Sequence, residues 1–597
     1  MAGAAGPVPP GARLRLGFAS AGVLLGAADT YVVVVALPAI MSSVGVDLAH
    51  LQQATPIISG FLVGYVAVLP LMGRLSDVYG RAPVLLGCLF LFAGGSLVTG
   101  SATTLSAVVV GRALQGAGGG GLVPVTLALV ADLWPAHRRG VPLGIVGAVQ
   151  EFGSVVGPLY GAALTAVSTW RAIFYVNMPL AAMIAAGVRT PRLAPRGERA
   201  RRPDVLGGTL ALLCGAATVL AIAVPPALAD NVTVGAAFTP LLGGVSASSP
   251  VALVALLAAV GFVVRQLTMG SAVRPLLPLR GLHRGRGLVD WPGGVLVALV
   301  LGCIIVSFAS ADPQRGVVGD AAPLLLPAAG LLTALFVVRE LRTAQPLVDL
   351  RALHDRAAVG SLVTNLFVGA ALMAALVDIP VFARATVDPD SQVAAALVLA
   401  RLLVAVPVGA VLGGLLVGRA GYRAVAGVGL LLTAVTFVVM SGWSATALDD
   451  RLAGISWLRG SDLVLVGCGL GFGLSIVPVT AAILGAVPQR LHGVAASLTV
   501  AARMVGMLTG LSLLTAIGLR RFYSVQAMLP DPAKLCPASP LNCAAYNTLA
   551  TGAAVDELHV IFMGAAVCAL IAAVSAAALL RRSGPTGVAG LLGVGVA

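Results

Sequence analysis

The chain has 597 residues, of which 58% are hydrophobic and only 10% are charged, and its formal net charge is +14. Soluble domains carry about 25% charged residues, so a chain with a mean hydropathy of +1.01 is too apolar to be one. The composition predicts an all-α polytopic membrane protein. Its basic residues lie in short loops between apolar runs, as in membrane proteins, so we expect no nucleic acid among its partners.

Apolar runs long enough for a membrane helix, roughly 20 residues, recur along the whole chain. They are continuous and lack the alternation of polar and apolar residues that is typical of a membrane β-barrel. We expect about sixteen spans of this length. They cover residues 17–40, 54–73, 82–101, 105–131, 141–167, 172–188, 205–224, 250–268, 288–310, 321–339, 357–383, 392–417, 424–442, 461–487, 494–519 and 557–580.

Arginines gather in alternate loops between these runs. Arg74 and Arg81 lie between the second and third runs, and Arg138 and Arg139 lie between the fourth and fifth. The segment 42–53, between the first two runs, has no arginine. Because cytoplasmic loops carry the excess of positive charge, we expect a multi-pass protein of the cytoplasmic (inner) membrane with both termini in the cytoplasm.

The middle of the chain contains an internal repeat. Residues 275–283, Pro-Leu-Leu-Pro-Leu-Arg-Gly-Leu-His, recur at 346–354 as Pro-Leu-Val-Asp-Leu-Arg-Ala-Leu-His. Each copy follows a related start, Asp-Val-Leu-Gly-Gly from Asp204 and Asp-Trp-Pro-Gly-Gly from Asp290. This pattern predicts a duplicated helix pair, which leaves six spans on either side. Such an arrangement is typical of transporters built from two related halves.

We therefore expect an N-terminal six-helix bundle (1–188), an inserted region with the duplicated helix pair (189–356), a C-terminal six-helix bundle (357–582) and a tail (583–597). The C-terminal bundle includes a polar extracytoplasmic loop at 522–556. Cys536 and Cys543 lie in that loop and would form a disulfide if it faces an oxidising compartment. No Cys/His cluster has the spacing of a metal site, so no bound metal is expected.

The loop between the second and third spans carries a motif with the spacing Gly-x₃-Asp-x₂-Gly-Arg, formed by Gly73, Asp77, Gly80 and Arg81. Glycines permit a tight turn, and an acid beside arginines provides ionic contacts that can form and break. With this loop the chain resembles the major facilitator superfamily, whose hallmark motif it matches. The resemblance implies the major facilitator fold, here two six-helix bundles plus about four inserted linker helices. The equivalent loop of the second half has Gly418 in place of the acid.

The fifth span resembles the signature of the antiporters of that superfamily. The signature residues are Gly144, Gly153, Gly157, Pro158 and Gly161. Segments in both halves, among them Leu-Val-Asp at 376–378 and Ala-Arg-Met at 502–504, resemble the mycobacterial triacylglyceride exporters, in the drug:proton antiporter branch. The resemblance implies proton-coupled export and a periplasmic lipid-binding lipoprotein as a partner. The duplicated middle departs from that family, which has one helix pair there.

Charged residues lie within several spans, where each costs ~3 kcal/mol or more unless it is paired, protonated or hydrated. Arg503 has no nearby acid in the sequence, so its partner must come from another helix, and Asp29 or Glu151 would serve. A buried acid has a lowered pKa beside an arginine and a raised pKa without one. A pair that forms in one conformation and breaks in another would therefore bind and release a proton in each cycle.

Further residues belong to this set of proton-coupling or ion-pairing candidates. Arg112 is expected to act like Arg503, or else to bond only the backbone and Gln115. Asp378 is expected to pair with Arg401, unless Arg401 snorkels to the membrane interface instead. For Asp29, the alternative to a coupling role is a structural hydrogen bond to a neighbouring helix.

Glu151 and one row of glycines in its span lie on different faces of the helix. Gly144 and Gly147 precede Glu151 by seven and four residues and share its face. Gly153 and the glycines four and eight residues after it form a separate stripe, which suits packing against another helix. Glu151 is thus expected to face a cavity.

These observations predict a secondary transporter rather than an enzyme, with no cofactor and with the proton gradient as its driving force. The glycine run 118–121 lacks the Lys-Ser/Thr of a phosphate-binding loop, which gives no support to ATP-driven transport. We expect a monomer in the lipid bilayer that exports a large apolar substrate, a triacylglyceride-like lipid or another hydrophobic molecule. The alternative is a broad drug:proton antiporter for multidrug efflux.

Overall fold

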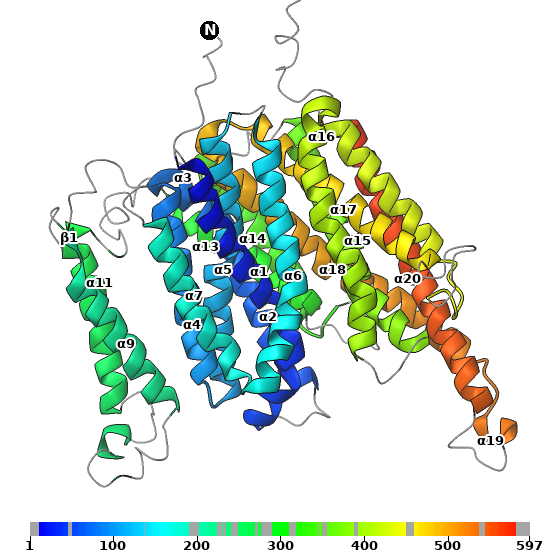
Figure 1. Cartoon of the computed structure of the whole chain (residues 1–597), viewed down its shortest axis with the longest axis horizontal. Helices are drawn as coiled ribbons and strands as arrows, with labels where there is room; N and C mark the ends of the chain where they lie inside the picture. The colour runs from blue at the N-terminus through cyan, green and yellow to red at the C-terminus, as the bar shows by residue number, and fades with distance from the viewer. Residues whose placement is uncertain are drawn as a thin grey trace, which may run out of the picture.

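The computed structural model describes residues 11–45, 51–135, 138–189, 202–223, 231, 235–239, 249–268, 273–274, 276, 289–309, 318–343, 346–348, 355–386, 392–448, 459–536 and 544–580. Long helices run side by side through it and form two bundles (Figure 1). Twelve helices among these residues are long and apolar enough to cross a membrane. The predicted class, an all-α polytopic membrane protein, is confirmed.

The N-terminal bundle is an array of long helices in which one predicted span is broken in two. The second span consists of α2 and α3, which separate at Val68, just before Pro70. Proline lacks the N–H that would continue the helical hydrogen bonds, so the break falls where the sequence permits it. The helices of this bundle are α1 (Ala12–Ser43), α2 (Leu51–Ala67), α3 (Leu69–Tyr79), α4 (Arg81–Ser101), α5 (Leu105–Leu133), α6 (Gly140–Val167) and α7 (Arg171–Val188).

The inserted region forms two helix pairs, as the repeat predicts. The first pair is α9 (Val205–Ala223) and α11 (Pro250–Thr268), with the short 3₁₀ helix η4 (Gly235–Phe238) between them. The second pair is α13 (Trp291–Ala309) and α14 (Ala322–Arg342). Two short strands, β1 (Arg202–Pro203) and β2 (Val273–Arg274), pair in parallel beside the first pair, with Arg202 opposite Val273.

Both helix pairs are closed at one end by the same acid–arginine clamp. Asp204 accepts a hydrogen bond from the Gly207 N–H and pairs with Arg265 of α11 at 3.1 Å. Asp290 likewise accepts from the Gly293 N–H, and it pairs with Arg339 of α14 at 2.7 Å. The repeated Asp-x-x-Gly start thus caps the first helix of each pair and ties it to the second helix.

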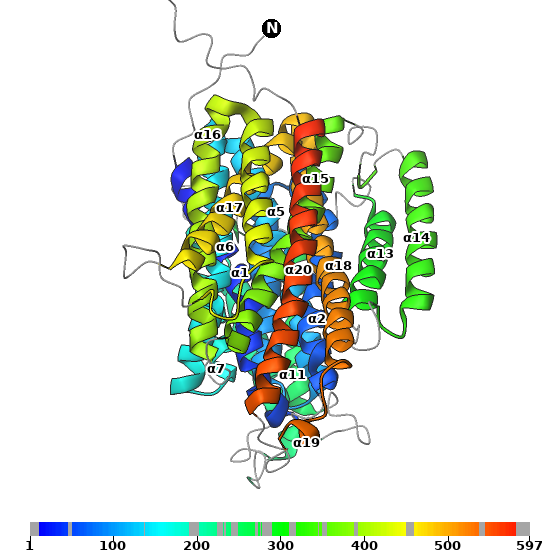
Figure 2. The same ribbon diagram turned by 90° about the vertical axis from the view of Figure 1, so that its right-hand side faces the viewer.

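The two pairs occupy different places around the bundles. The α9/α11 pair stands at the outer side of the N-terminal bundle beside α4 (Figure 1), where Phe262 stacks on Phe90 with the ring centroids 5.4 Å apart. The α13/α14 pair lies beside α18 (Figure 2), and α13 contacts both α2 and α18. The Ser512 hydroxyl of α18 donates to the Phe308 carbonyl of α13 at 3.1 Å. Among the described helices, the second pair thus touches both halves, whereas the first pair packs against α4 of the N-terminal half.

The C-terminal bundle begins at α15. Gly421, with φ +77°, divides α16 into the two spans predicted at 392–417 and 424–442. The predicted polar segment 522–556 is partly helical, because α18 continues to Gln526 and α20 begins at Ala544. The elements are α15 (Arg356–Thr386), α16 (Gln392–Met440), α17 (Gly460–Ala486), η8 (Gln489–Leu491), α18 (His492–Gln526), α19 (Pro532–Leu535) and α20 (Ala544–Leu579).

The glycine stripe of α6 packs against α1. A Cβ on Gly157 would lie 2.3 Å from the Ala28 carbonyl oxygen, and one on Gly153 would lie 2.7 Å from the Ala27 Cβ. Gly161 meets Val32 in the same way. The stripe thus allows close contact of the two backbones. Pro158 shares this helix, but its side chain lies outside the described part of the chain.

Candidate functional site

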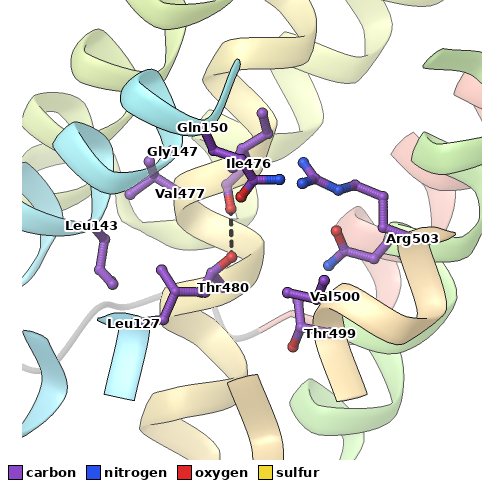
Figure 3. Close-up of a pocket in the computed structure, with 11 residues that line it drawn as sticks. Leu127, Leu143, Gly147, Gln150, Ile476, Val477, Thr480, Thr499, Val500 and Arg503 are labelled. Atoms are coloured by element: carbon purple, nitrogen blue, oxygen red, sulfur yellow. Dashed lines mark hydrogen bonds between the residues drawn. The ribbon is translucent and has the colours of Figure 1, made fainter. Parts of the chain in front are cut away.

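Two small cavities lie at the centre of the molecule, where the two bundles meet. The cavity in Figure 3 has a volume of about 20 Å³ and is lined by residues of α5 and α6 on one side and of α15, α17 and α18 on the other. A neighbouring cavity of about 30 Å³ contains Tyr65, Glu151 and Met504 in its wall. Each has room for about one water molecule.

Arg503 and Glu151 form an ion pair across this centre. Glu151 lies in α6 and Arg503 in α18, so the pair joins the two halves, and its N···O distance is 3.0 Å. Both residues are buried. Of the two acids expected as partners for Arg503, the structure therefore selects Glu151. Gln150 points toward the same arginine (Figure 3), so two consecutive residues of α6 meet α18 here.

Asp29 lies in a second polar network, which is confined to the N-terminal half. The Arg112 guanidinium donates to Asp29 at 2.6 Å, and Gln115 and Asn177 each donate to the same carboxylate at 2.8 Å. Ser96 accepts from Gln115 at 2.7 Å. The network thus joins α1, α4, α5 and α7. Both predicted bonds of Arg112 are present at once, one to an acid and one to Gln115 at 2.8 Å.

This network is sealed from solvent. Asp29 is 2% exposed and Arg112 is 1% exposed, and the Phe61 ring lies 4.2 Å below the guanidinium as a cation–π partner. Sequence reasoning did not single out Ser96 or Asn177 as members. Both are polar side chains within apolar spans, and this pattern indicates a hydrogen-bonded network, because an unpaired polar group in a membrane helix is energetically unfavourable.

Asp378 lies in α15 and does not pair with Arg401, so that prediction is wrong. Arg401 instead pairs with Asp462 of α17, at the edge of the same bundle. Asp378 is buried and makes no ion pair or hydrogen bond with any residue that the structure describes. Glu557 of α20 lies near enough to interact with it electrostatically. The C-terminal half therefore holds two acids close enough to interact, the buried Asp378 and the half-buried Glu557.

The predicted motif loop joins the two halves at the end of the molecule where α1 begins. The Asp77 carboxylate accepts hydrogen bonds from the backbone N–H groups of Gly493 at 2.9 Å and Val494 at 3.2 Å. These are free N–H groups of the first turn of α18, so Asp77 caps a helix of the opposite half and meets the positive end of its dipole. Arg81 holds Asp77 and also pairs with Asp132 at 2.8 Å.

Two pairs of glycines bring the backbones of the halves together at this same end. A Cβ on Gly73 would lie 2.4 Å from the Gly493 carbonyl oxygen, and a Cβ on Gly414 would lie 2.4 Å from the Gly140 carbonyl oxygen. In each case a larger residue would force the helices apart. We call the Asp77–α18 bonds and these two glycine contacts the latch.

The two loops that carry the latch have matching backbones. Gly80 and Gly421 occupy equivalent positions and have φ values of +90° and +77°, which favour glycine over any other residue. Gly418, which replaces the acid in the second loop, has no atom within 4 Å of the place of its Cβ. The latch therefore has two backbone contacts but only one charged cap.

Cys536 is disulfide-bonded. The other cysteines that the structure describes, at positions 88, 214, 303, 468 and 568, are free. The predicted partner, Cys543, lies outside the described residues, as do the tail 583–597 and most of both repeat copies.

Two helical bundles that meet at the centre of the molecule are the architecture of membrane transporters built from two related halves. The family model of the major facilitator superfamily matches residues 19–511. The chain belongs to this superfamily, and the predicted fold class is confirmed.

Curated relatives match most of the chain. A triacylglyceride transporter of Mycolicibacterium hassiacum is 36% identical over 519 residues, which are 86% of this chain and 81% of that protein. A triacylglyceride transporter of Mycolicibacterium smegmatis is 35% identical over 94% of this chain and 86% of its own length. One of Mycobacterium tuberculosis is 34% identical over 87% and 85%. Family and relatives both indicate a transporter rather than an enzyme.

Solved structures share the fold at low sequence identity. The human organic anion transporter MFSD10 is 14% identical, with a TM-score of 0.50 over 94% of this chain and 100% of that chain. The proton:xylose symporter XylE, bound to 6-bromo-6-deoxy-D-glucose, is also 14% identical, with a TM-score of 0.50 over 94% of each chain. At this identity the likeness concerns the fold alone.

Proposed function

We propose that this protein is a proton-coupled exporter of large apolar lipids of the triacylglyceride type. It works by alternating access in the cytoplasmic membrane, with both termini in the cytoplasm. Relatives at 34–36% identity named as triacylglyceride transporters support the substrate class. A periplasmic lipid-binding lipoprotein receives the lipid, and the transporter acts as a monomer.

The Glu151–Arg503 ion pair is the observation that carries the proposal. It joins α6 to α18 across the centre, so it must break whenever the halves separate there. A carboxylate that loses its arginine in an apolar environment has a raised pKa and binds a proton. It releases that proton when the arginine returns and lowers the pKa again. The rocking of the two halves is thereby linked to proton uptake and release.

The latch supports alternating access at one end of the molecule. Asp77, Gly73 and Gly140 all hold elements of one half against the other there. A state that opens this end has to break these contacts, while the central ion pair lies deeper in the bundle. The two cavities beside that pair are far too small for a lipid. A lipid is therefore loaded in a conformation in which the halves lie further apart.

A reconstituted system tests the coupling. In proteoliposomes with an imposed proton gradient, we expect Glu151→Gln to abolish gradient-driven export of a labelled triacylglyceride, while the protein stays folded. The matched control is Asp462→Asn, which removes the acid of an ion pair within one half and should leave gradient-driven export intact. Export by Glu151→Gln at the wild-type rate would remove this residue from the coupling site.

A second candidate function, multidrug efflux, is favoured by one observation. Asp378 and Glu557 lie close together in the C-terminal half, and neither has a cationic partner among the described residues. A buried acid such as Asp378, with a second acid nearby, suits a cationic substrate, because burying a charge is costly unless it is paired. Lipid analysis of a deletion strain beside a drug-susceptibility panel separates the two functions. Accumulated neutral lipid with unchanged susceptibility favours lipid export, and the reverse result favours drug efflux.

A further inference from the structure

A groove of about 740 Å³ runs between the beginnings of α1 and α6, away from the centre of the molecule. It belongs to the N-terminal half alone and is far larger than either central cavity. Its wall contains one aromatic residue, Trp134, which is 9% exposed. Apart from two arginines at one end and Ser20 along the wall, the rest of the lining is apolar: Leu16, Gly17, Ala21, Leu24, Val141, Pro142, Ile145 and Val149.

Two arginines mark one end of the groove. Arg13 lies at the start of α1 and Arg138 lies just before α6, and both side chains are exposed. Neither guanidinium forms an ion pair or a hydrogen bond within the described residues. By contrast, Arg81, Arg112 and Arg503 are each paired with an acid. Among the described residues, the mouth of the groove thus carries two positive charges without an acidic partner.

The length of the groove matches one leaflet of a bilayer. Arg13 and Leu24 are eleven residues apart on α1, and at about 1.5 Å per residue the lining spans about 16 Å. Half of the hydrocarbon core of a membrane is about 15 Å thick. Ser20 lies between these two residues. Its hydroxyl is buried and makes no hydrogen bond among the described residues.

We propose that this groove binds one phospholipid with an anionic headgroup, drawn from the surrounding bilayer. The phosphate lies against Arg13 and Arg138, because guanidinium groups bind phosphate oxygens with charge-assisted hydrogen bonds. One acyl chain lies along the apolar wall between α1 and α6. The ligand differs from the exported lipid proposed above, since a triacylglyceride has no phosphate or charge for the arginines to bind. The site therefore stands or falls independently of the transport function.

Trp134 provides a built-in probe for this lipid. The full chain has five tryptophans, so the experiment uses a variant in which Trp170, Trp291, Trp443 and Trp457 are changed to Phe. It is reconstituted with phosphatidylglycerol or phosphatidylcholine that carries bromine on the acyl chains, and quenching of Trp134 is measured against the mole fraction of brominated lipid. We expect a preference for phosphatidylglycerol on the order of tenfold, because its headgroup has a net negative charge beside the two arginines, whereas the choline of phosphatidylcholine offsets its phosphate.

Variants separate the headgroup contact from the chain contact. Arg13→Gln with Arg138→Gln should abolish the preference and leave equal quenching by both lipids. Arg419→Gln with Arg423→Gln, which removes two arginines of α16 outside the groove, should keep it. Gly17→Phe should reduce quenching by both lipids, because no atom lies within 4 Å of the place of its Cβ and the ring would fill the groove.

Three results would overturn the proposal. The first is equal quenching by the two lipids in the protein that keeps all its arginines. The second is a preference that survives the double substitution of Arg13 and Arg138. The third is a preference that emerges only after deletion of residues 2–10, which would mean that this preceding segment, and not a phospholipid, fills the groove in the full chain.

Discussion

At the scale of single residues, two buried ion pairs differ in whether they join the two halves or lie within one of them. Glu151 and Arg503 come from opposite halves, so separation of the halves breaks their contact. Asp29 and Arg112 lie in the same half, within a network that also holds Gln115. Rigid movement of the halves leaves that pair intact. The geometry thus favours Glu151 for coupling and gives Asp29 a role in holding α1 to α5.

Substituting Asp29 by Asn tests that role. The change leaves the Arg112 charge buried without an acid, and such a loss costs about 3–5 kcal/mol. We expect export to be lost and thermal unfolding in detergent to occur at a lower temperature, while the fold is retained.

The double variant Asp29→Asn with Arg112→Gln provides the control. Removing both charges should restore much of the thermal stability, because no unpaired charge is left in the apolar core. If Asp29→Asn alone unfolded at the wild-type temperature, the pair would contribute nothing to the stability of this half.

At the scale of helices, the latch depends on close backbone contact and on one helix end. The first turn of α18 presents its N–H groups to Asp77. A negative charge at that position stabilises by about 0.3–1 kcal/mol at an exposed site and by more when it is partly buried. Since only one of the two matching loops has an acid, this interaction acts at the α3–α18 contact and has no counterpart at the α6–α16 contact.

Gly73→Ala tests the latch. The new Cβ would lie 2.4 Å from the Gly493 carbonyl oxygen, so α3 and α18 must separate. With spin labels on the exposed residues Ala82 and Gly485, we expect the distance distribution between the halves to shift to longer values.

Gly418→Ala is the matched control, because it adds the same methyl group in the equivalent loop, where no atom lies within 4 Å. Its distance distribution should match that of the unsubstituted protein. An unchanged distribution for Gly73→Ala would show that the glycine contact does not hold this end closed.

At the scale of the whole molecule, the duplicated helix pairs have the same internal clamp but different neighbours. The α13/α14 pair contacts both halves through α13, whereas α9/α11 lies beside α4. The clamp of the first pair has a pKa that differs from that of a free carboxylate. For Asp204, burial raises the pKa, but hydrogen bonds from Gly207, Gln266 and Arg265 outweigh it and hold the pKa below its ordinary value. A carboxylate with a lowered pKa stabilises the folded state above about pH 4, the pKa of the unfolded chain. This stabilisation is lost only as the pH falls through the lowered value.

Asp290→Ala and Asp204→Ala form a matched pair of variants. At neutral pH both should loosen one helix pair, since each removes a charged clamp. With the same two spin labels, Asp290→Ala should broaden the distance distribution between the halves, and Asp204→Ala should leave it unchanged. Broadening by both variants, or by neither, would contradict a bridging role that is specific to α13.

Much of this architecture could be predicted from the sequence, because long apolar runs have few alternatives to membrane helices. The break at Val68 was not predicted because it falls within a continuous apolar run. The extension of α18 and α20 into 522–556 was not predicted because polar residues at the end of a long helix look like a loop. The partner of Arg503 could be narrowed to two acids, but choosing Glu151 required the positions of α6 and α18. The pairing of Arg401 with Asp462 was missed because residues 61 positions apart meet only when helices pack.

The position of α13 has a consequence for the route by which an apolar substrate would enter. The two halves of such a transporter meet along two lateral interfaces, and a molecule that enters from the lipid bilayer would pass through one of them. On the side of α2 and α18, α13 covers this route. A lipid that enters sideways would therefore use the opposite side, where α6 faces α16. The inserted helices would then make the two sides of the molecule unequal, with one side covered and the other open to the lipid phase.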